Sequence, residues 1–166
     1  MQPPASLDNQ QGYLLCICSS RSVGTSYLST VHARVVPLIS GYFSGVGDLF
    51  SAMTLGHFNP SSSAASDGKL HSQTPLSFAV AAALHKTYSI LELTNTFAAR
   101  LPPEECTATD EEQDAAEPLR RLRRMRGREL RLVQGQNILR EEWREGKGKD
   151  MHIWDRFWDP DFYPSL

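Results

Sequence analysis

The stretch SGVGDLF at residues 44–50 constrains the fold of this chain more than any other part of its sequence. The apolar run before it, which ends in an aromatic residue, predicts an extended segment, and the apolar spacing after it predicts a helix. Gly45 and Gly47 carry no side chain and lose more conformational freedom on folding than any other residue type. Glycines at this position therefore indicate that the bare backbone is needed, either for a tight turn or for the close approach of another group.

Two interpretations of this turn follow from the residues alone. The first amides of a helix have no intrahelical partner and carry partial positive charge, so glycines there suit an anion such as phosphate. A carboxylate at Asp48 would repel an anion that only bound, but it could take the proton from a hydroxyl that attacks phosphorus. The first interpretation is thus phosphoryl transfer to an alcohol. The second is a tight turn in which Asp48 serves only as a helix cap.

Composition limits the class of protein. The chain has 166 residues, which suits one domain, and 17 basic against 19 acidic side chains exclude a globally basic nucleic-acid-binding protein. No apolar run approaches the roughly 20 residues that span a bilayer, and residues 1–11 lack the features of a signal peptide. Three cysteines argue against a disulfide framework, and the scattered histidines show no metal-binding spacing. These features favour a reducing compartment, the cytoplasm, with the nucleus as a second candidate.

The pattern of residues predicts a mixed α/β fold. An apolar run at 12–20 predicts a buried strand with Cys16 and Cys18 as small core side chains, and 27–36 predicts a second strand ended by Pro37. A helix begins at the glycine turn and closes near Gly56. A long helix follows the polar loop at 59–73, with Thr74 as its N-cap, Pro75 as its first residue and its end near Pro102.

The remaining third of the chain divides into three parts. Residues 102–127 are an insertion, acidic and mobile at first and then arginine-rich, and 128–145 predict an edge strand followed by a short helix. Residues 146–166 form an aromatic tail that we expect to dock on the domain rather than float. Seven arginines follow the acidic residues: Arg120, Arg121, Arg123, Arg124, Arg126, Arg128 and Arg131. They could bind RNA, but a basic face that compensates the acidic insertion is the simpler interpretation.

Four blocks of the sequence resemble the C-terminal part of the pyridoxal kinases, within the ribokinase-like superfamily. They are GYLLCICSSRSV, ARVVPLISGYFSGVGDLFSAMTLGHF, LSFAVAAALHKTYSILELT and RELRLVQGQNIL, in the family's order. The resemblance spans most of residues 12–140, with 12–101 and 128–145 as the kinase portion. It implies a partial ribokinase-like fold, in which these strands and helices belong to a larger central sheet.

The resemblance implies ATP-dependent phosphorylation of the 5′-hydroxymethyl of pyridoxal, pyridoxine or pyridoxamine, the salvage route to pyridoxal 5′-phosphate. Asp48 matches the catalytic base, and Gly45, Val46 and Gly47 match the anion hole around the transferred phosphoryl group. Val46 replaces the commoner threonine. The cofactors implied are ATP and Mg²⁺, with a monovalent cation such as K⁺ as a further candidate, and no metal ligand of the chain itself is identified. The residues that match nucleotide-lining positions are Val36, Pro37, Leu38 and Ile39.

Family members are about twice as long as this chain and are usually homodimers. Their N-terminal half, which holds the vitamin pocket and the lid, has no counterpart here, so we expect a truncated kinase that could be inactive alone. One alternative is another ribokinase-like kinase, such as one for a hydroxymethylpyrimidine, although ELRLVQ favours pyridoxal kinase. The other is a non-catalytic interaction fragment that uses the arginine run or the aromatic tail. Nucleic acid and membrane are not expected partners.

Overall fold

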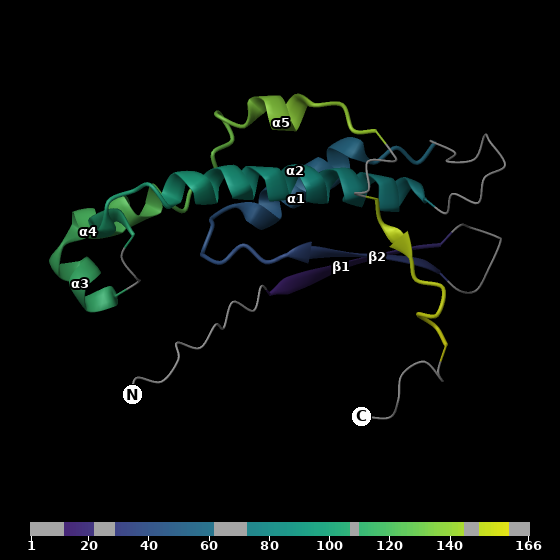
Figure 1. Ribbon diagram of the computed structural model, residues 1–166, viewed down its shortest axis with the longest axis horizontal. Helices are drawn as coiled ribbons and strands as arrows, with labels where there is room; N and C mark the ends of the chain where they lie inside the picture. Colours follow the sequence, from purple (N-terminus) through teal and green to yellow (C-terminus); the bar gives the residue numbers. More distant parts are fainter. Residues whose placement is uncertain (1–11, 22–28, 62–72, 107–109, 145–149, 160–166) are drawn as a thin grey trace, which may run out of the picture.

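The computed structural model describes residues 12–21, 29–61, 73–106, 110–144 and 150–159. They form one antiparallel sheet of three strands with helices stacked on one of its faces (Figure 1). The fold is therefore mixed α/β, as the sequence predicts. In chain order the elements are β1 (Tyr13–Ser20), β2 (Thr30–Pro37), α1 (Val46–His57), α2 (Pro75–Ala98), the 3₁₀ turn η1 (Pro103–Glu105), α3 (Glu111–Ala116), α4 (Pro118–Met125), α5 (Gln136–Arg140) and β3 (His152–Ile153).

The sheet has the order β1-β2-β3, which leaves β1 at one edge. β1 pairs with β2 over its full length, from Tyr13 opposite Pro37 to Ser20 opposite Thr30. Pro37 is the last residue of β2, where its missing N–H costs no ladder hydrogen bond. The sequence predicts both strands, although residues 27 and 28 of the second lie outside the described residues.

The prediction that β1 is a buried strand is wrong. Tyr13, Leu14 and Leu15 have exposed fractions of 62%, 54% and 52%. The cause is position, because β1 is an edge strand and the described helices cover only one face of the sheet. Cys16 and Cys18 on the covered face do pack against the core, and burial raises the pKa of the Cys18 thiol to about 11. The cysteines thus pack against the core but are only partly buried, whereas the sequence predicts core side chains.

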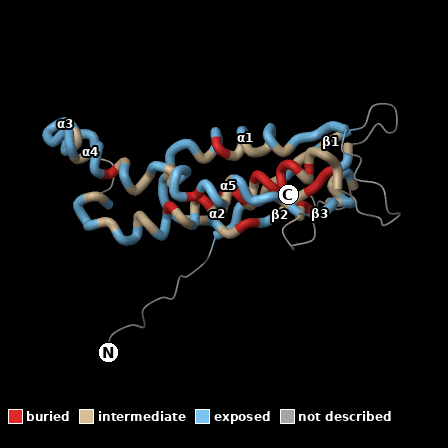
Figure 2. Tube along the Cα trace, turned by 90° about the horizontal axis from the view of Figure 1, so that it is seen from above, coloured by how far each residue is buried: buried red, intermediate tan, exposed pale blue. Residues whose placement is uncertain are grey.

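Helix α2 is the centre of the core, and most of the buried residues lie along it (Figure 2). Thr74 caps the helix: its hydroxyl accepts from the Ser77 amide at 3.1 Å, and Ser77 Oγ accepts from the Thr74 amide at 2.8 Å. Five consecutive buried residues from Ala79 to Ala83 let α1 and the sheet approach α2 closely. Local capping signals therefore placed this helix where the sequence predicts it.

The described residues of the insertion, 102–106 and 110–127, are folded, which corrects the expectation that its acidic first part is mobile. Asp110 caps α3 by accepting the Gln113 amide at 3.0 Å, and Pro118 begins α4. Asp114 of α3 lies between Arg120 and Arg124 of α4, with 2.6 Å between its Oδ1 and Arg120 Nη1. The insertion is ordered because its opposite charges neutralise one another. The arginines of the insertion thus compensate its acidic residues. Residues 107–109 lie outside the described part of the chain.

Residues 128–134, predicted as an edge strand, do not form one. Their only described strand-like pairing is a parallel bridge between Ser44 and Glu129. Beyond that bridge the chain turns, because Thr94 Oγ1 accepts from the Arg131 amide at 3.1 Å and the Arg131 guanidinium lies 3.9 Å from the centre of the Phe97 ring. Contacts with α2 therefore replace a neighbouring strand. The short helix expected after this segment is present as α5.

The aromatic tail docks on the sheet over its described residues, 150–159, as the sequence predicts. β3 adds to β2, the Trp154 amide donates to the Val31 carbonyl at 2.8 Å, and Trp158 Nε1 donates to the Ser29 carbonyl at 2.9 Å. Phe157 packs edge-to-face between the two tryptophans. Residues 160–166 and 1–11 fall outside the described part of the chain. Within the described part, no helix is long and apolar enough to cross a membrane.

Candidate active site

The glycine turn is held from both sides by backbone contacts. The loop after β2 bends at Gly41, whose φ is 132°. The Ser44 amide then donates to the Arg128 carbonyl at 2.8 Å, which ties the loop to the segment after α4. Gly45 follows with φ at 83°, in the left-handed region that favours glycine, and helix α1 begins at the next residue. The start of α1 is therefore fixed by pairing with a segment more than eighty residues away in sequence.

The first turn of α1 presents backbone amides without internal partners. The Gly45 carbonyl accepts from the Leu49 amide at 3.0 Å, which is the first hydrogen bond of the helix. No side chain caps this end, in contrast to α2 with its Thr74–Ser77 capping box. Within the described residues, the amides of Val46, Gly47 and Asp48 donate no hydrogen bond. These amides and the positive end of the helix dipole make this end of α1 suited to an anion.

Glycine occupies positions 45 and 47 of the turn for different physical reasons. Gly45 needs its positive φ, and a Cβ built there would meet only Leu130 Cδ1, at 4.0 Å. Gly47 has an ordinary negative φ, and a Cβ built there meets nothing within 4 Å. Neither packing nor backbone conformation within the described residues requires glycine at position 47. A group that approaches the backbone closely from outside the chain would require it.

We expect Gly45→Ala to lower the free energy of unfolding by about 1–2 kcal/mol, because an L side chain is strained at positive φ. Urea denaturation followed by circular dichroism measures this change. Gly56→Ala, in the same helix, is the matched control. Gly56 has no positive φ and no neighbour within 4 Å of a built Cβ, so alanine there should raise stability by about 0.5–1 kcal/mol. Equal changes in the two variants would contradict a special backbone conformation at position 45.

Asp48 lies at the third position of α1, directly beside these amides. Its side chain is exposed and, among the described residues, makes no hydrogen bond or ion pair. Because Gly45 precedes the helix, Asp48 is not the N-cap, so its interpretation as a simple helix cap is wrong. A carboxylate in the first turn interacts favourably with the helix dipole and stays available to an incoming group. The structure thus keeps the four turn residues together at the start of α1, where Gly45, Gly47 and Asp48 are exposed and Val46 is half-buried.

The four residues expected to line a nucleotide lie at the end of β2. Val36 is 6% exposed and faces the core, whereas Leu38 is 45% exposed and Pro37 and Ile39 are intermediate. The chain between Ile39 and the turn, residues 40–43, lines a pocket of about 220 Å³ with residues from α2 and the insertion. The surface available to a ligand on this side therefore comes from Pro37, Leu38 and Ile39 rather than from Val36.

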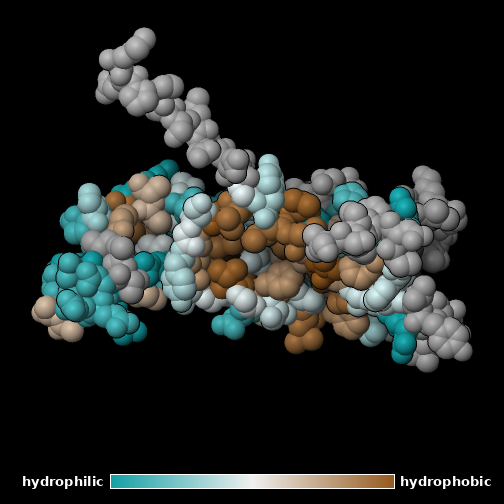
Figure 3. Space-filling model, turned by 90° about the horizontal axis from the view of Figure 1, so that it is seen from below, coloured by the Kyte–Doolittle hydropathy of each residue, from teal (hydrophilic) through white to brown (hydrophobic). Residues whose placement is uncertain are grey.

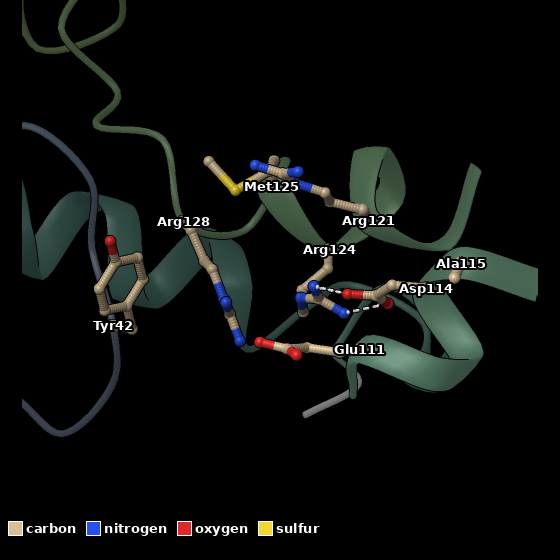
Figure 4. Close-up of a pocket in the computed structure, with 8 residues that line it drawn as sticks. All are labelled: Tyr42, Glu111, Asp114, Ala115, Arg121, Arg124, Met125 and Arg128. Carbon is tan, nitrogen blue, oxygen red and sulfur yellow. Dashed lines mark hydrogen bonds and ion pairs between the residues drawn. The ribbon is translucent and has the colours of Figure 1, made fainter. Parts of the chain in front are cut away.

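A larger pocket, of about 720 Å³, borders the same loop (Figure 4). Its walls come from the insertion and from Tyr42, whose ring centre lies 5.4 Å from the Arg128 guanidinium. The role of Tyr42 could not be predicted from the sequence, because nothing local indicates that it meets Arg128. Most of the lining is charged, and the carboxylate of Asp114 accepts hydrogen bonds from Nη1 and Nη2 of Arg124. The residues that line it are Tyr42, Glu111, Asp114, Ala115, Arg121, Arg124, Met125 and Arg128.

The ion pairs of Asp114 predict that the stability of the insertion depends on pH. Hydrogen bonds from Arg124 and then Arg120 lower the pKa of Asp114 from 3.8 to about 2. The pairs therefore stabilise the fold fully above pH 3.8, and this contribution is lost as the pH falls toward 2. Asp114→Asn at neutral pH should leave α4 open to cleavage by trypsin at its arginines several-fold faster than in the parent chain. The control variant Glu112→Gln changes an exposed side chain on α3 and should be cleaved at the rate of the parent chain. Equal cleavage rates for Asp114→Asn and the parent chain would contradict a structural role for Asp114.

The described residues contain no group of three or more histidine, cysteine, aspartate or glutamate side chains that could hold a metal ion. Asp48 is a single carboxylate beside the anion-binding amides. This arrangement does not fit a metal held by the protein alone. Mg²⁺ is often bound by one or two carboxylates together with substrate phosphates, so any Mg²⁺ at this turn would depend on a bound nucleotide.

Comparisons with known protein families, with curated proteins and with solved structures give no match to this chain.

Proposed function

We propose that this chain provides the phosphate-binding end and the catalytic base of a ribokinase-like kinase for small alcohols, with pyridoxal kinase as the specific activity. The reaction would transfer the γ-phosphoryl group of ATP to the 5′-hydroxymethyl of pyridoxal, pyridoxine or pyridoxamine. The four blocks that resemble pyridoxal kinases support this proposal. We further propose that the enzyme is cytoplasmic and functions as a homodimer.

The observation that carries the proposal is the exposed start of α1. Among the described residues, the first amides of α1 and the Asp48 carboxylate have no partner, and packing does not require the glycine at position 47. These groups lie within one turn of helix. Amides and the helix dipole favour the negative charge of phosphate. A carboxylate in the first turn interacts favourably with the helix dipole, and beside a bound phosphate it would in addition act on a group other than the phosphate. A hydroxyl that attacks phosphorus is such a group.

The proposed step is an in-line displacement. The alcohol oxygen forms a bond to the γ-phosphorus, the bond from this phosphorus to the bridging oxygen breaks, and ADP leaves. Asp48 accepts the proton of the alcohol. The amides of Val46 and Gly47 donate to the oxygens of the transferred group, where charge rearranges in the transition state. Val46 serves as well as threonine for this purpose, because only its backbone takes part.

The rest of the nucleotide would follow the loop toward β2. Pro37, Leu38 and Ile39 offer apolar surface there, and residues 40–43 line the neighbouring pocket. Mg²⁺ would neutralise the phosphates when ATP is bound, and a monovalent cation such as K⁺ is a further candidate. The chain's own contribution is to bind phosphate with amides and to accept the proton at an Asp48 carboxylate oxygen.

Gly47→Ala tests the proposal, because it separates binding from stability. An alanine in the first turn of a helix should raise the free energy of unfolding by about 0.5–1 kcal/mol. The added methyl group would lie where the phosphate approaches, so affinity for MgATP should fall at least about tenfold, or about 1.4 kcal/mol. Isothermal titration calorimetry with MgATP and urea denaturation measure the two effects on the same protein.

Ala52→Gly is the matched control, since Ala52 is exposed in the middle of α1. It should lower stability by about 1 kcal/mol and leave MgATP affinity unchanged. A wild-type chain that shows no MgATP binding would overturn the proposal for this chain. Binding without transfer of labelled phosphate to pyridoxal would support the phosphate site and leave catalysis to a longer chain. Transfer to a hydroxymethylpyrimidine but not to pyridoxal would favour the other kinase.

A further inference from the structure

The larger of the two pockets beside the loop after β2 has the size of a small-molecule site. Its volume of about 720 Å³ lies within the range of roughly 300–1,000 Å³ that is typical of ligand pockets. Figure 4 shows Tyr42 on one side of it, α3 on the other, and the arginines of α4 and the following turn between them. None of the turn residues 45–48 belongs to the lining. Segments distant in sequence therefore enclose a space that the proposed kinase step does not use.

Positive charge exceeds negative charge around this pocket. The Asp114 carboxylate accepts hydrogen bonds from Arg124 Nη1 at 2.8 Å, from Arg124 Nη2, and from Arg120 Nη1 at 2.6 Å. Two guanidinium groups thus share the charge of one carboxylate. The other charged side chains of the lining are Glu111, Arg121 and Arg128. The walls therefore keep a surplus of positive charge, which favours an anionic occupant.

Arg121 is the lining side chain best suited to bind this anion. Among the described residues, its guanidinium makes no hydrogen bond and no ion pair, and the residue is exposed. Its neighbours on α4 are engaged, Arg124 with Asp114 and Arg123 with Glu117 at 3.0 Å. A guanidinium presents its N–H groups as a planar fork that matches two oxygens of a phosphate. Arg121 thus offers such a fork at the wall of the pocket.

Tyr42 gives the pocket a flat aromatic wall. The residue is 67% exposed, and the Arg128 guanidinium lies 5.4 Å from the centre of its ring. The Arg128 carbonyl accepts the Ser44 amide at 2.8 Å, so the segment that carries Arg128 is tied to the loop that carries Tyr42. An exposed ring of this kind stacks on another aromatic ring. A ligand with both a ring and an anionic group would use both walls.

We propose that this pocket binds a small phosphorylated aromatic molecule, with its phosphate on Arg121 and its ring against Tyr42. A phosphate monoester carries close to two negative charges at neutral pH and has three acceptor oxygens, whereas a carboxylate carries one charge. The surplus of guanidinium groups therefore suits phosphate better. The proposal goes beyond the kinase activity and does not depend on it, because the start of α1 takes no part.

A small ligand fits this surface better than a nucleic-acid strand. The insertion forms a hydrophilic end of the molecule, beside the apolar middle (Figure 3). Its basic side chains do not form a continuous stripe that would follow a phosphate backbone, because carboxylates engage most of them. Arg126, for example, pairs with Glu105 at 2.8 Å. The charge available to a ligand is therefore concentrated in the pocket.

The first test is calorimetric titration of the full chain with phenyl phosphate, and with inorganic phosphate and benzoate for comparison. We expect phenyl phosphate to bind several-fold more tightly than either, because only phenyl phosphate carries both groups. Arg121→Gln should weaken its binding at least about tenfold, through loss of charged hydrogen bonds. Arg123→Gln is the matched control, since Arg123 is exposed on the same helix but lies outside the lining. This variant should bind phenyl phosphate as the parent chain does.

Two further variants locate the ring and separate this site from the start of α1. Tyr42→Leu should keep the affinity for inorganic phosphate and lose the preference for phenyl phosphate. Gly47→Ala should bind phenyl phosphate as the parent chain does, whatever it does to MgATP. In the unmodified chain, phenyl phosphate should shift the amide NMR signals of residues 111–115 and 121–128 more than those of 46–48.

Several results would overturn the proposal. One is a parent chain that does not bind phenyl phosphate, and another is full binding by Arg121→Gln. Equal losses in Arg121→Gln and Arg123→Gln would show general attraction by the arginines rather than a site. Loss of binding in Gly47→Ala, or larger NMR shifts at 46–48, would place phenyl phosphate at the start of α1.

Discussion

Asp48→Asn is expected to slow phosphoryl transfer from ATP to pyridoxal by about 10²–10⁴-fold and to leave MgATP affinity equal or higher. The amide side chain has the same shape but accepts no proton at neutral pH. It also removes a negative charge from beside the phosphates, so binding should not weaken. Transfer of labelled phosphate, measured beside calorimetric titration with MgATP, separates the two effects.

A purely structural role for Asp48 would give a different pattern. Loss of a carboxylate in the first turn of a helix costs about 0.3–1 kcal/mol of stability, so a structural effect would appear in urea denaturation and would weaken binding and transfer together. Glu112→Gln is the control, since Glu112 is an exposed carboxylate on α3; it should transfer phosphate at the parent rate. An Asp48→Asn chain that transfers phosphate at the parent rate would remove Asp48 from the mechanism.

The second large effect is expected in the core, where Ile90→Ala should lower the free energy of unfolding by about 2–5 kcal/mol. Ile90 is 0% exposed on α2 and reaches the segment before α5. Removal of its side chain loses buried apolar surface and leaves a cavity between these elements. Urea denaturation measures the change. Leu55→Ala on α1, where the side chain is 77% exposed, should change stability by no more than about 0.5 kcal/mol.

Gly135 provides an independent check of this packing. A Cβ built at Gly135 would lie 2.1 Å from Ile90 Cδ1, so Gly135→Ala should destabilise the chain by about 1–3 kcal/mol through overpacking. The alanine at position 90 makes room for that methyl group. The double variant should therefore be more stable than the sum of the single effects predicts. Strict additivity of the two changes would show that the side chains do not meet.

Much of the fold follows from local sequence. Thr74, Pro75 and Ser77 act within one turn of chain, and the helix they begin is where the sequence predicts it. The turn at Gly45 could be predicted for the same reason, because a strand that runs into glycines and then an amphipathic segment is a local pattern. The exposure of Asp48 follows from that turn as well.

The insertion at 102–127 shows what local patterns miss. The composition of its acidic first part predicts mobility, because such a segment has few apolar side chains to bury. Order came instead from ion pairs between two short helices, above all those of Asp114 with Arg120 and Arg124. Residues 128–134 show the converse, because an alternating pattern forms a strand only beside a partner, and here α2 binds the Arg131 amide instead.

By itself, the sequence determined strands β1 and β2, the capped helix α2 and the glycine turn with Asp48, because each depends on residues a few positions apart. The tertiary structure alone decided that Arg128 holds the loop at Ser44 and meets Tyr42, and that apolar β1 lies at an exposed edge. These features join or separate segments distant in sequence. They depend on the packing free energy of the whole chain, which no local pattern records.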